Sequence, residues 1–175
     1  MPGIHGVVNI AHWNALPTDE FVEGLRGIWE HSPWIAREVA TARPFASRED
    51  LLRAMWEVVL TAPDDRKLAL LRAHPDLAGK FARAAALTAE SAGEQASAGL
   101  DRLSDAEYER FTDLNAAYCQ RFGFPFIVCV RNHTKESILH AFGRRLANSQ
   151  DIELQNALDE VRRIAEYRLN DLIEP

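Results

Sequence analysis

Cysteine is scarce in this 175-residue sequence, which contains only Cys119 and Cys129. Cys129 lies in an apolar run at residues 126–130, where a small buried thiol is its expected role. The sequence also has no basic cluster followed by an apolar core near its start, and no apolar stretch as long as the ~20 residues that cross a bilayer. We therefore expect a reducing compartment, no disulfide framework, no secretory signal and no membrane span.

Positively charged residues are also fewer than negatively charged ones. The 20 Lys and Arg are outnumbered by 26 Asp and Glu, which gives a formal net charge of -6. This balance disfavours partners bound through phosphates, so we expect neither nucleic acid nor an anionic membrane surface as a partner. Glycine-rich phosphate loops and a Gly-x-Ser-x-Gly elbow are absent, and Cys129 has no charged neighbour closer in sequence than Arg131. These absences argue against phosphate-loop enzymes and against a Ser or Cys nucleophile.

The composition itself, 47% hydrophobic and 26% charged, is ordinary for a globular protein. A chain of this length suits one domain and buries roughly two-thirds of its unfolded surface without a metal or a disulfide. No segment repeats at a fixed period. We expect a single domain over residues 1–175, with residues 1–15 as a loosely ordered N-terminal segment.

Helical spacing of apolar residues, with start and stop signals, recurs along the chain. Thr18 starts a helix that is expected to run to about Glu30, and Ser47 starts another that ends before the next proline. Ser104 and Glu107 form a capping box. Further helix starts are expected near Ser32-Pro33, Asp64, Thr88, Thr134 and Asn148, whereas the Ala-rich stretch 78–87 is weakly patterned. The expected count is seven or eight helices.

Residues 124–130 form the one β-like run, and no second strand pattern exists for it to pair with. A buried extended segment therefore fits better than a sheet. The sequence predicts an all-α fold, a single compact domain of seven or eight helices with one short extended segment.

His74 is the first candidate for chemistry because Pro75 follows it and ends the preceding helix. A histidine at that position projects from a rigid corner at the negative end of the helix dipole, which favours its protonated form. The alternative is that His74 only caps the last carbonyls of that helix, which is the commoner fate of a terminal histidine.

A second group of polar side chains is expected on one side of a helix, where Ser91, Glu94 and Gln95 are spaced three and four residues apart. A solvated polar face would have the same pattern. Residues 127–131 are more informative, because an unpartnered extended segment still has backbone groups that must be hydrogen-bonded, and a flat polar ring could supply the partners. Arg131 beside them makes a suitable seat for a carboxylate or ureido group, unless it forms only a surface ion pair.

Metal-ligand residue types are present, but apart from surface candidates no pair has the spacing of a helical metal site. The candidates are His74, Asp76, Glu94, His133 and His140. We expect no metal.

Five runs of this sequence, taken in order, resemble the 2-oxo-4-hydroxy-4-carboxy-5-ureidoimidazoline (OHCU) decarboxylase family. The most distinctive is His74-Pro75-Asp76-Leu77, within residues 73–78. The others are residues 30–34, 42–45, 91–95 with 98–100, and 122–131. Together they extend the resemblance over nearly the whole chain.

The resemblance implies a cofactor-free decarboxylation that yields (S)-allantoin in urate breakdown. By that similarity His74 is the catalytic histidine and Glu94 its acidic companion. The implied substrate contacts are Pro75, Ser91, Gln95, Arg131 and the backbone of Ile127, Val128, Cys129 and Val130. The sequence shows no second domain for the preceding hydrolysis and no terminal Ser-Lys-Leu. We expect a small-molecule substrate, a separate hydrolase, a cytoplasmic location and a homodimer.

Two other classes of function remain open. In a catalytically silent helical binding module, His74 and Arg131 would only stabilise turns and a dimer surface. In a metal-dependent hydrolase on the same helices, activity would be lost with a chelator.

Overall fold

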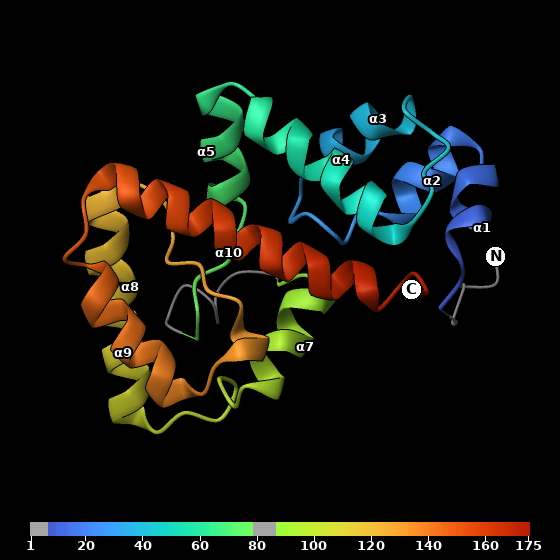
Figure 1. Ribbon diagram of the computed structural model, residues 1–175. Helices are drawn as coiled ribbons and strands as arrows, with labels where there is room; N and C mark the ends of the chain where they lie inside the picture. The colour runs from blue at the N-terminus through green and yellow to red at the C-terminus, as the bar shows by residue number, and fades with distance from the viewer. Residues whose placement is uncertain (1–6, 79–86) are drawn as a thin grey trace. The chain divides into compact units, whose positions relative to one another are not determined.

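The structure is a computed structural model that describes residues 7–78 and 87–175 (Figure 1). Within these ranges it contains nine α-helices, one 3-10 turn and no strand, apart from an isolated bridge between Val8 and Ile173. In chain order the elements are α1 (Ile10–Ala15), α2 (Thr18–Gly24), α3 (Trp34–Ala40), α4 (Arg48–Thr61), α5 (Asp64–Arg72), α7 (Ala89–Ser97), α8 (Asp105–Phe122), η1 (Val130–Asn132), α9 (Lys135–Arg145) and α10 (Gln150–Asn170). The predicted all-α fold is confirmed. Residues 1–6 and most of the Ala-rich stretch, 79–86, lie outside the described residues.

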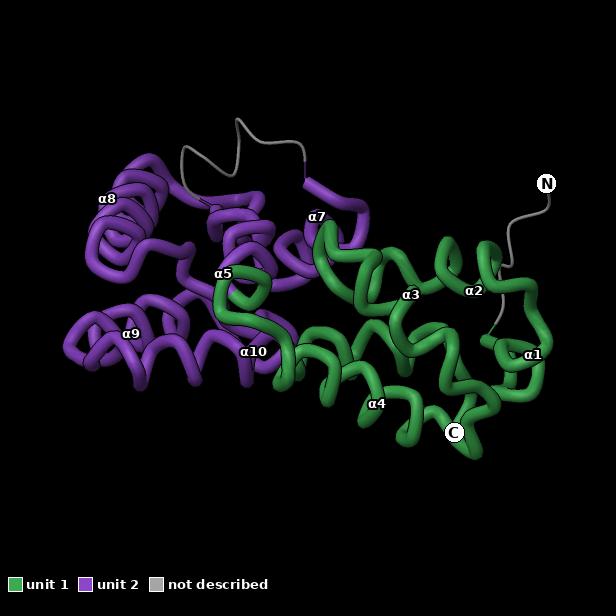
Figure 2. The backbone as a smooth tube through the Cα atoms, turned by 90° about the horizontal axis from the view of Figure 1, so that it is seen from above, with its two compact units in different colours: residues 1–67, 162–175 green, residues 68–161 purple. Residues whose placement is uncertain are grey.

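The chain divides into two compact units (Figure 2). Unit 1 comprises residues 1–67 and 162–175, and unit 2 comprises residues 68–161. Every residue predicted to act in catalysis or substrate binding belongs to unit 2. None of the helices in the described ranges combines the length and the apolar composition needed to cross a bilayer.

Local capping chemistry explains why several helices start where they do. The Ser47 side chain accepts a hydrogen bond from the backbone of Asp50 at the start of α4, and Ser104 and Glu107 form the predicted capping box of α8. The α8 helix ends at Gly123, whose φ of 79° is the left-handed conformation that glycine adopts without strain. The predicted helix starts at Ser47 and Ser104 are confirmed.

The prediction for α2 is wrong at both ends. Thr18 does not cap it, because Pro17 holds the N-cap position, and the helix ends at Gly24 instead of near Glu30. The buried ring of Trp13, on the unexpected helix α1, lies 2.6 Å from where a Cβ on Gly24 would stand. Beyond Gly24 the chain continues in tight turns, which two glycines within four residues favour over helix. Ser32 also fails to cap α3, since its hydroxyl donates to the Glu30 carbonyl.

These turns place Glu30 in the interior of unit 1, where it meets Arg168 of α10. Arg168 Nη1 donates to a Glu30 carboxylate oxygen at 2.8 Å and to the Gly27 carbonyl at 3.0 Å. Both side chains are at most 4% exposed. The ion pair therefore fastens the irregular segment after α2 to the last helix of the chain.

Unit 2 has an aromatic core around a buried carboxylate. Tyr118 packs among Phe122, Phe124, Phe126 and Phe142. Glu153 of α10 is fully buried and accepts hydrogen bonds from the side chains of Tyr118, Arg145, Asn148 and Asn156. Burial alone would raise the pKa of this carboxyl, but the hydrogen bonds and the Arg145 charge outweigh burial and lower it.

Replacing Glu153 by glutamine is expected to cost unfolding free energy that is larger at neutral pH than in acid. Because the folded-state pKa is lowered, the carboxylate's contribution is complete above the unfolded value of 4.5 and is lost as the pH falls through the folded value. Urea unfolding of wild type and variant from about pH 6 to about pH 3 measures this gap. Glu166→Gln, at an exposed position on α10, is the control. A gap that stays constant over this range would contradict the expectation.

Candidate active site

His74 stands just beyond the end of α5, as the following proline predicts. Its backbone N–H donates to the Leu71 carbonyl at 3.2 Å, and its ring Nδ1 lies 2.9 Å from the Leu70 carbonyl oxygen. A carbonyl can only accept, so Nδ1 carries the proton and Nε2 is the basic nitrogen of the neutral ring. The side chain is 8% exposed. His74 therefore does cap its helix, and it does so through Nδ1.

Two buried amides hold the loop that follows His74. The Gln95 side chain donates to the Asp76 carbonyl at 3.2 Å and accepts from the Ala78 backbone at 3.1 Å. Asn115 of α8 donates to the Leu77 carbonyl at 2.8 Å. Ala78 has a φ of 55°, a left-handed conformation that is uncommon outside glycine and needs such support. The loop is thus fixed from two helices.

Asn115 is a residue of this region that sequence reasoning missed. It occupies a position of the buried stripe of α8 that includes Phe111, Tyr118 and Phe122. A lone amide among aromatic side chains at helical spacing was the available signal, because a buried amide must find a hydrogen-bond partner. The residue type of Asp76 indicates only a metal-ligand candidate, and its partial burial raises the pKa of its carboxyl.

Helix α7 brings the second group of predicted residues together. Thr88 caps it by accepting from the Ser91 backbone at 3.2 Å. Ser91 and Gln95 are 5% and 7% exposed, and the Glu94 side chain is 10% exposed. The alternative of a solvated polar face is therefore wrong for this helix.

The predicted extended segment is buried, and side chains satisfy part of its backbone. The Cys129 N–H donates to a Glu160 carboxylate oxygen at 2.8 Å, and the Ile127 carbonyl accepts from Arg145 at 2.6 Å. The expectation that this backbone lacks protein partners is wrong for these two groups. Val130 and Arg131 belong to the 3-10 turn η1 instead of the extended run. The buried-thiol prediction for Cys129 is confirmed, and burial, with the nearby Glu160 charge, raises the pKa of Cys129 to about 11.

Arg131 meets Glu94 where η1 packs against α7. Arg131 Nη2 lies 3.7 Å from a Glu94 carboxylate oxygen, and the two side chains are 28% and 10% exposed. A partly buried pair of this kind is screened less than an exposed one. The structure thus joins Glu94 to Arg131 directly, and Gln95, the next residue along α7, to the loop of His74.

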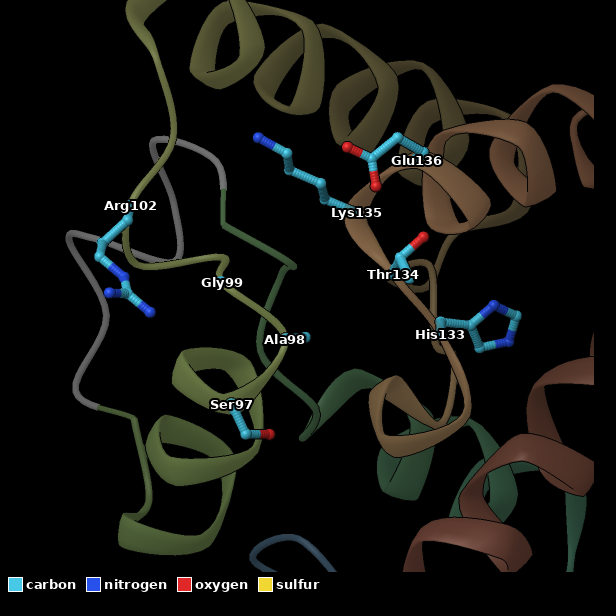
Figure 3. A pocket seen from close by; sticks show the side chains of 8 residues that line it. All are labelled: Ser97, Ala98, Gly99, Arg102, His133, Thr134, Lys135 and Glu136. Atoms are coloured by element: carbon cyan, nitrogen blue, oxygen red, sulfur yellow. The ribbon is translucent and has the colours of Figure 1, made fainter.

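A surface pocket of about 360 Å³ lies beside this region, lined by the end of α7 and the start of α9 (Figure 3). In the figure, the Lys135 and His133 side chains extend in opposite directions from their segment. The lining residues are Ser97, Ala98, Gly99, Arg102, His133, Thr134, Lys135 and Glu136. None of them is a predicted catalytic or substrate-binding residue. Among the described residues, no three His, Cys, Asp or Glu side chains lie close enough to hold one metal ion.

The fold and these residues define an all-α protein in which a histidine at a helix end is followed by a loop bonded to α7, and α7 also carries the acid that pairs with Arg131 of η1. Comparison with known proteins identifies the family. The OHCU decarboxylase family model matches residues 14–170, and the chain belongs to that family. The predicted family membership is confirmed.

Comparison with individual proteins gives the same family. The chain is 45% identical to the OHCU decarboxylase of Haloferax volcanii, over 89% of this chain and 90% of that protein. It is 42% identical to the one from Amia calva, over 92% of each. Among solved structures, a crystal structure of (S)-allantoin synthase superposes with a TM-score of 0.77 at 34% identity, covering 95% of this chain and 55% of that one.

Proposed function

We propose that this protein decarboxylates OHCU to (S)-allantoin in urate breakdown and that no cofactor takes part. The observation that carries the proposal is the arrangement of α7. This helix joins Arg131 through Glu94 and the loop of His74 through Gln95, in a chain that belongs to the OHCU decarboxylase family.

The chemistry suits a site built only from side chains and backbone. In this substrate the departing carboxylate sits on a carbon next to a C=N bond. When the carbon–carboxylate bond breaks, carbon dioxide leaves and the electron pair delocalises toward the neighbouring C=N bond. The hydroxyl on the carbon that lost the carboxylate gives up its proton and becomes the carbonyl of allantoin, while a proton is added to the neighbouring, ureido-bearing carbon. The protein has to align the breaking bond with the π-system and exclude water.

We assign the proton transfer to Nε2 of His74, the nitrogen that the contact with Leu70 leaves basic. Glu94 orients the histidine or balances its charge when it is protonated. A helix end is a suitable place for this cycle, because the carbonyls there stabilise the imidazolium.

We assign substrate binding to Pro75, Ser91, Gln95, Arg131 and the backbone of residues 127–130. The Arg131 guanidinium would hold the substrate's carboxylate or ureido group, with Glu94 keeping it in place before the substrate binds. Both ends of the Gln95 amide already hold the His74 loop, so its substrate contact would use the remaining N–H or the second lone pair of its oxygen.

Direct observation of the reaction tests the function. OHCU is generated enzymatically from urate, and the appearance of (S)-allantoin is followed by circular dichroism with and without the protein. The proposal requires formation well above the spontaneous rate. Equal rates with and without active, folded protein would refute it.

Replacing Arg131 by alanine is expected to weaken substrate binding more than it slows turnover. Loss of a charge-assisted hydrogen bond is worth about 1.5–3 kcal/mol, so we expect a rise in KM of about 10- to 100-fold with a smaller change in kcat. The control is Arg102→Ala, because Arg102 lies nearby with its side chain 82% exposed. An unchanged KM would remove Arg131 from the binding site.

We also propose that the protein is a homodimer in the cytoplasm. The two unpaired thiols are consistent with a reducing compartment. Light scattering coupled to size-exclusion chromatography measures the oligomeric state, and a monomeric mass would contradict the dimer.

A further inference from the structure

The extended segment before η1 has hydrogen bonds along one edge. In extended backbone the N–H and C=O of one residue point to the same side, and successive residues alternate. Cys129 has extended backbone, with φ of -72° and ψ of 94°. In an extended segment Ile127 and Cys129, two residues apart, would direct their groups to one edge and Val128 its own to the other. The edge shared by Ile127 and Cys129 is the one bound by Arg145 and Glu160.

We propose that Glu160 and Arg145 are positioning residues that fix which edge of this segment the substrate meets. This inference rests on the proposed function. With the Ile127 carbonyl and the Cys129 N–H engaged by the protein, the substrate would hydrogen-bond to the edge formed by Val128.

Glu160 is the more direct of the two. Its carboxylate accepts from the Cys129 N–H at 2.8 Å, a charge-assisted bond to a residue that is 1% exposed. Without this acceptor the buried N–H would have to find another partner, and a rotation of the segment is the simplest way to find one. That rotation would exchange the two edges.

Arg145 acts from α9 on the preceding part of the segment. Its Nη1 donates to the Ile127 carbonyl at 2.6 Å, and its guanidinium lies 4.4 Å from the centre of the Phe126 ring. Its Nε donates to the fully buried Glu153 at 2.9 Å. The hydrogen bond to Glu153 thus holds the planar Arg145 guanidinium in the orientation in which it donates to the Ile127 carbonyl.

Charges of the candidate site also act on this segment. The charges of Glu94 and Arg131, as well as that of Glu160, act on the Cys129 thiol. A shift of Cys129 would therefore change the surroundings of the Glu94–Arg131 pair. Glu160 is a suitable residue to replace, because it is partly exposed and its replacement does not open the core.

The test compares Glu160→Leu with Glu160→Gln in steady-state kinetics with enzymatically generated OHCU. Leucine removes the acceptor, whereas glutamine keeps an oxygen that the Cys129 N–H can use. We expect KM to rise about 10-fold or more in Glu160→Leu, with a smaller change in kcat. Glu160→Gln is expected to restore most of the affinity. Asp159→Ala is the matched control, since the neighbouring Asp159 bonds only to Gln155 among the described contacts.

A wild-type KM in the leucine variant, or a glutamine variant no better than leucine, would overturn the inference. A loss of the same size in Asp159→Ala would also overturn it. The proposed function is tested separately by the unmodified enzyme. If wild type forms no (S)-allantoin, the function fails and the inference fails with it, whereas wild-type turnover with an unaffected leucine variant contradicts the inference alone.

Discussion

Replacing His74 by asparagine is expected to lower kcat by about 10²- to 10⁴-fold while leaving the unfolding free energy nearly unchanged. Asparagine is the right replacement because its amide nitrogen lies close to where Nδ1 stands. It can therefore keep the hydrogen bond to the Leu70 carbonyl. What it removes is Nε2, the nitrogen to which we assign proton transfer.

The measurement combines single-turnover decarboxylation, (S)-allantoin binding and urea unfolding. His74→Ala is the paired variant, since it loses both the cap and the catalytic nitrogen. We expect the two variants to be equally inactive and the alanine variant to be less stable by about 1 kcal/mol, the usual worth of such a hydrogen bond. Wild-type turnover in His74→Asn would exclude His74 as the proton-transfer residue.

The largest effect on stability is expected from Glu30→Leu. This change leaves the Arg168 guanidinium buried without its carboxylate, and breaking one side of a buried ion pair costs about 3–5 kcal/mol. In a protein of this size each kcal/mol lowers the melting temperature by about 2–4 °C. Calorimetry and urea unfolding measure the loss.

Two further variants test whether the loss of stability comes from the buried ion pair. The double variant Glu30→Leu/Arg168→Met replaces both charges by apolar groups and is expected to recover most of the stability. Glu23→Ala breaks the exposed pair with Arg26, whose side chain is 71% exposed, and should change stability by less than about 1 kcal/mol. If Glu30→Leu were as mild as Glu23→Ala, the buried pair would not stabilise unit 1.

Features with a local cause could be predicted from the sequence. The start of α4 at Ser47 and the capping box of α8 depend on side chains that bond to backbone within three residues. The corner at His74 depends on the next residue being proline. The early end of α2 escaped prediction because the buried apolar residues after Gly24 recur at helical spacing, although the chain there runs in tight turns.

The candidate site also has features that the sequence predicts and features that depend on long-range packing. Periodicity placed Ser91 and Gln95 on one face of α7, and the resemblance to a family supplied roles for His74, Glu94 and Arg131, which remain predictions. Periodicity could not show that Glu94 and Arg131 pair, because 37 residues separate them and the contact depends on how η1 packs against α7. The bonds from Glu160 and Arg145 to the extended segment are also long-range. Charged residues on helices usually face solvent, so nothing in their spacing distinguishes these two.

The hydrogen bond between Nδ1 of His74 and the Leu70 carbonyl has a stereochemical consequence. The imidazole cannot flip about its Cβ–Cγ bond without breaking that contact, so Nε2 always faces the same direction. A proton that leaves and returns through Nε2 then reaches a planar carbanion from one side only. The chirality of the product would therefore be set by the last turn of α5, and a reaction in heavy water should place deuterium on a single face of the new stereocentre.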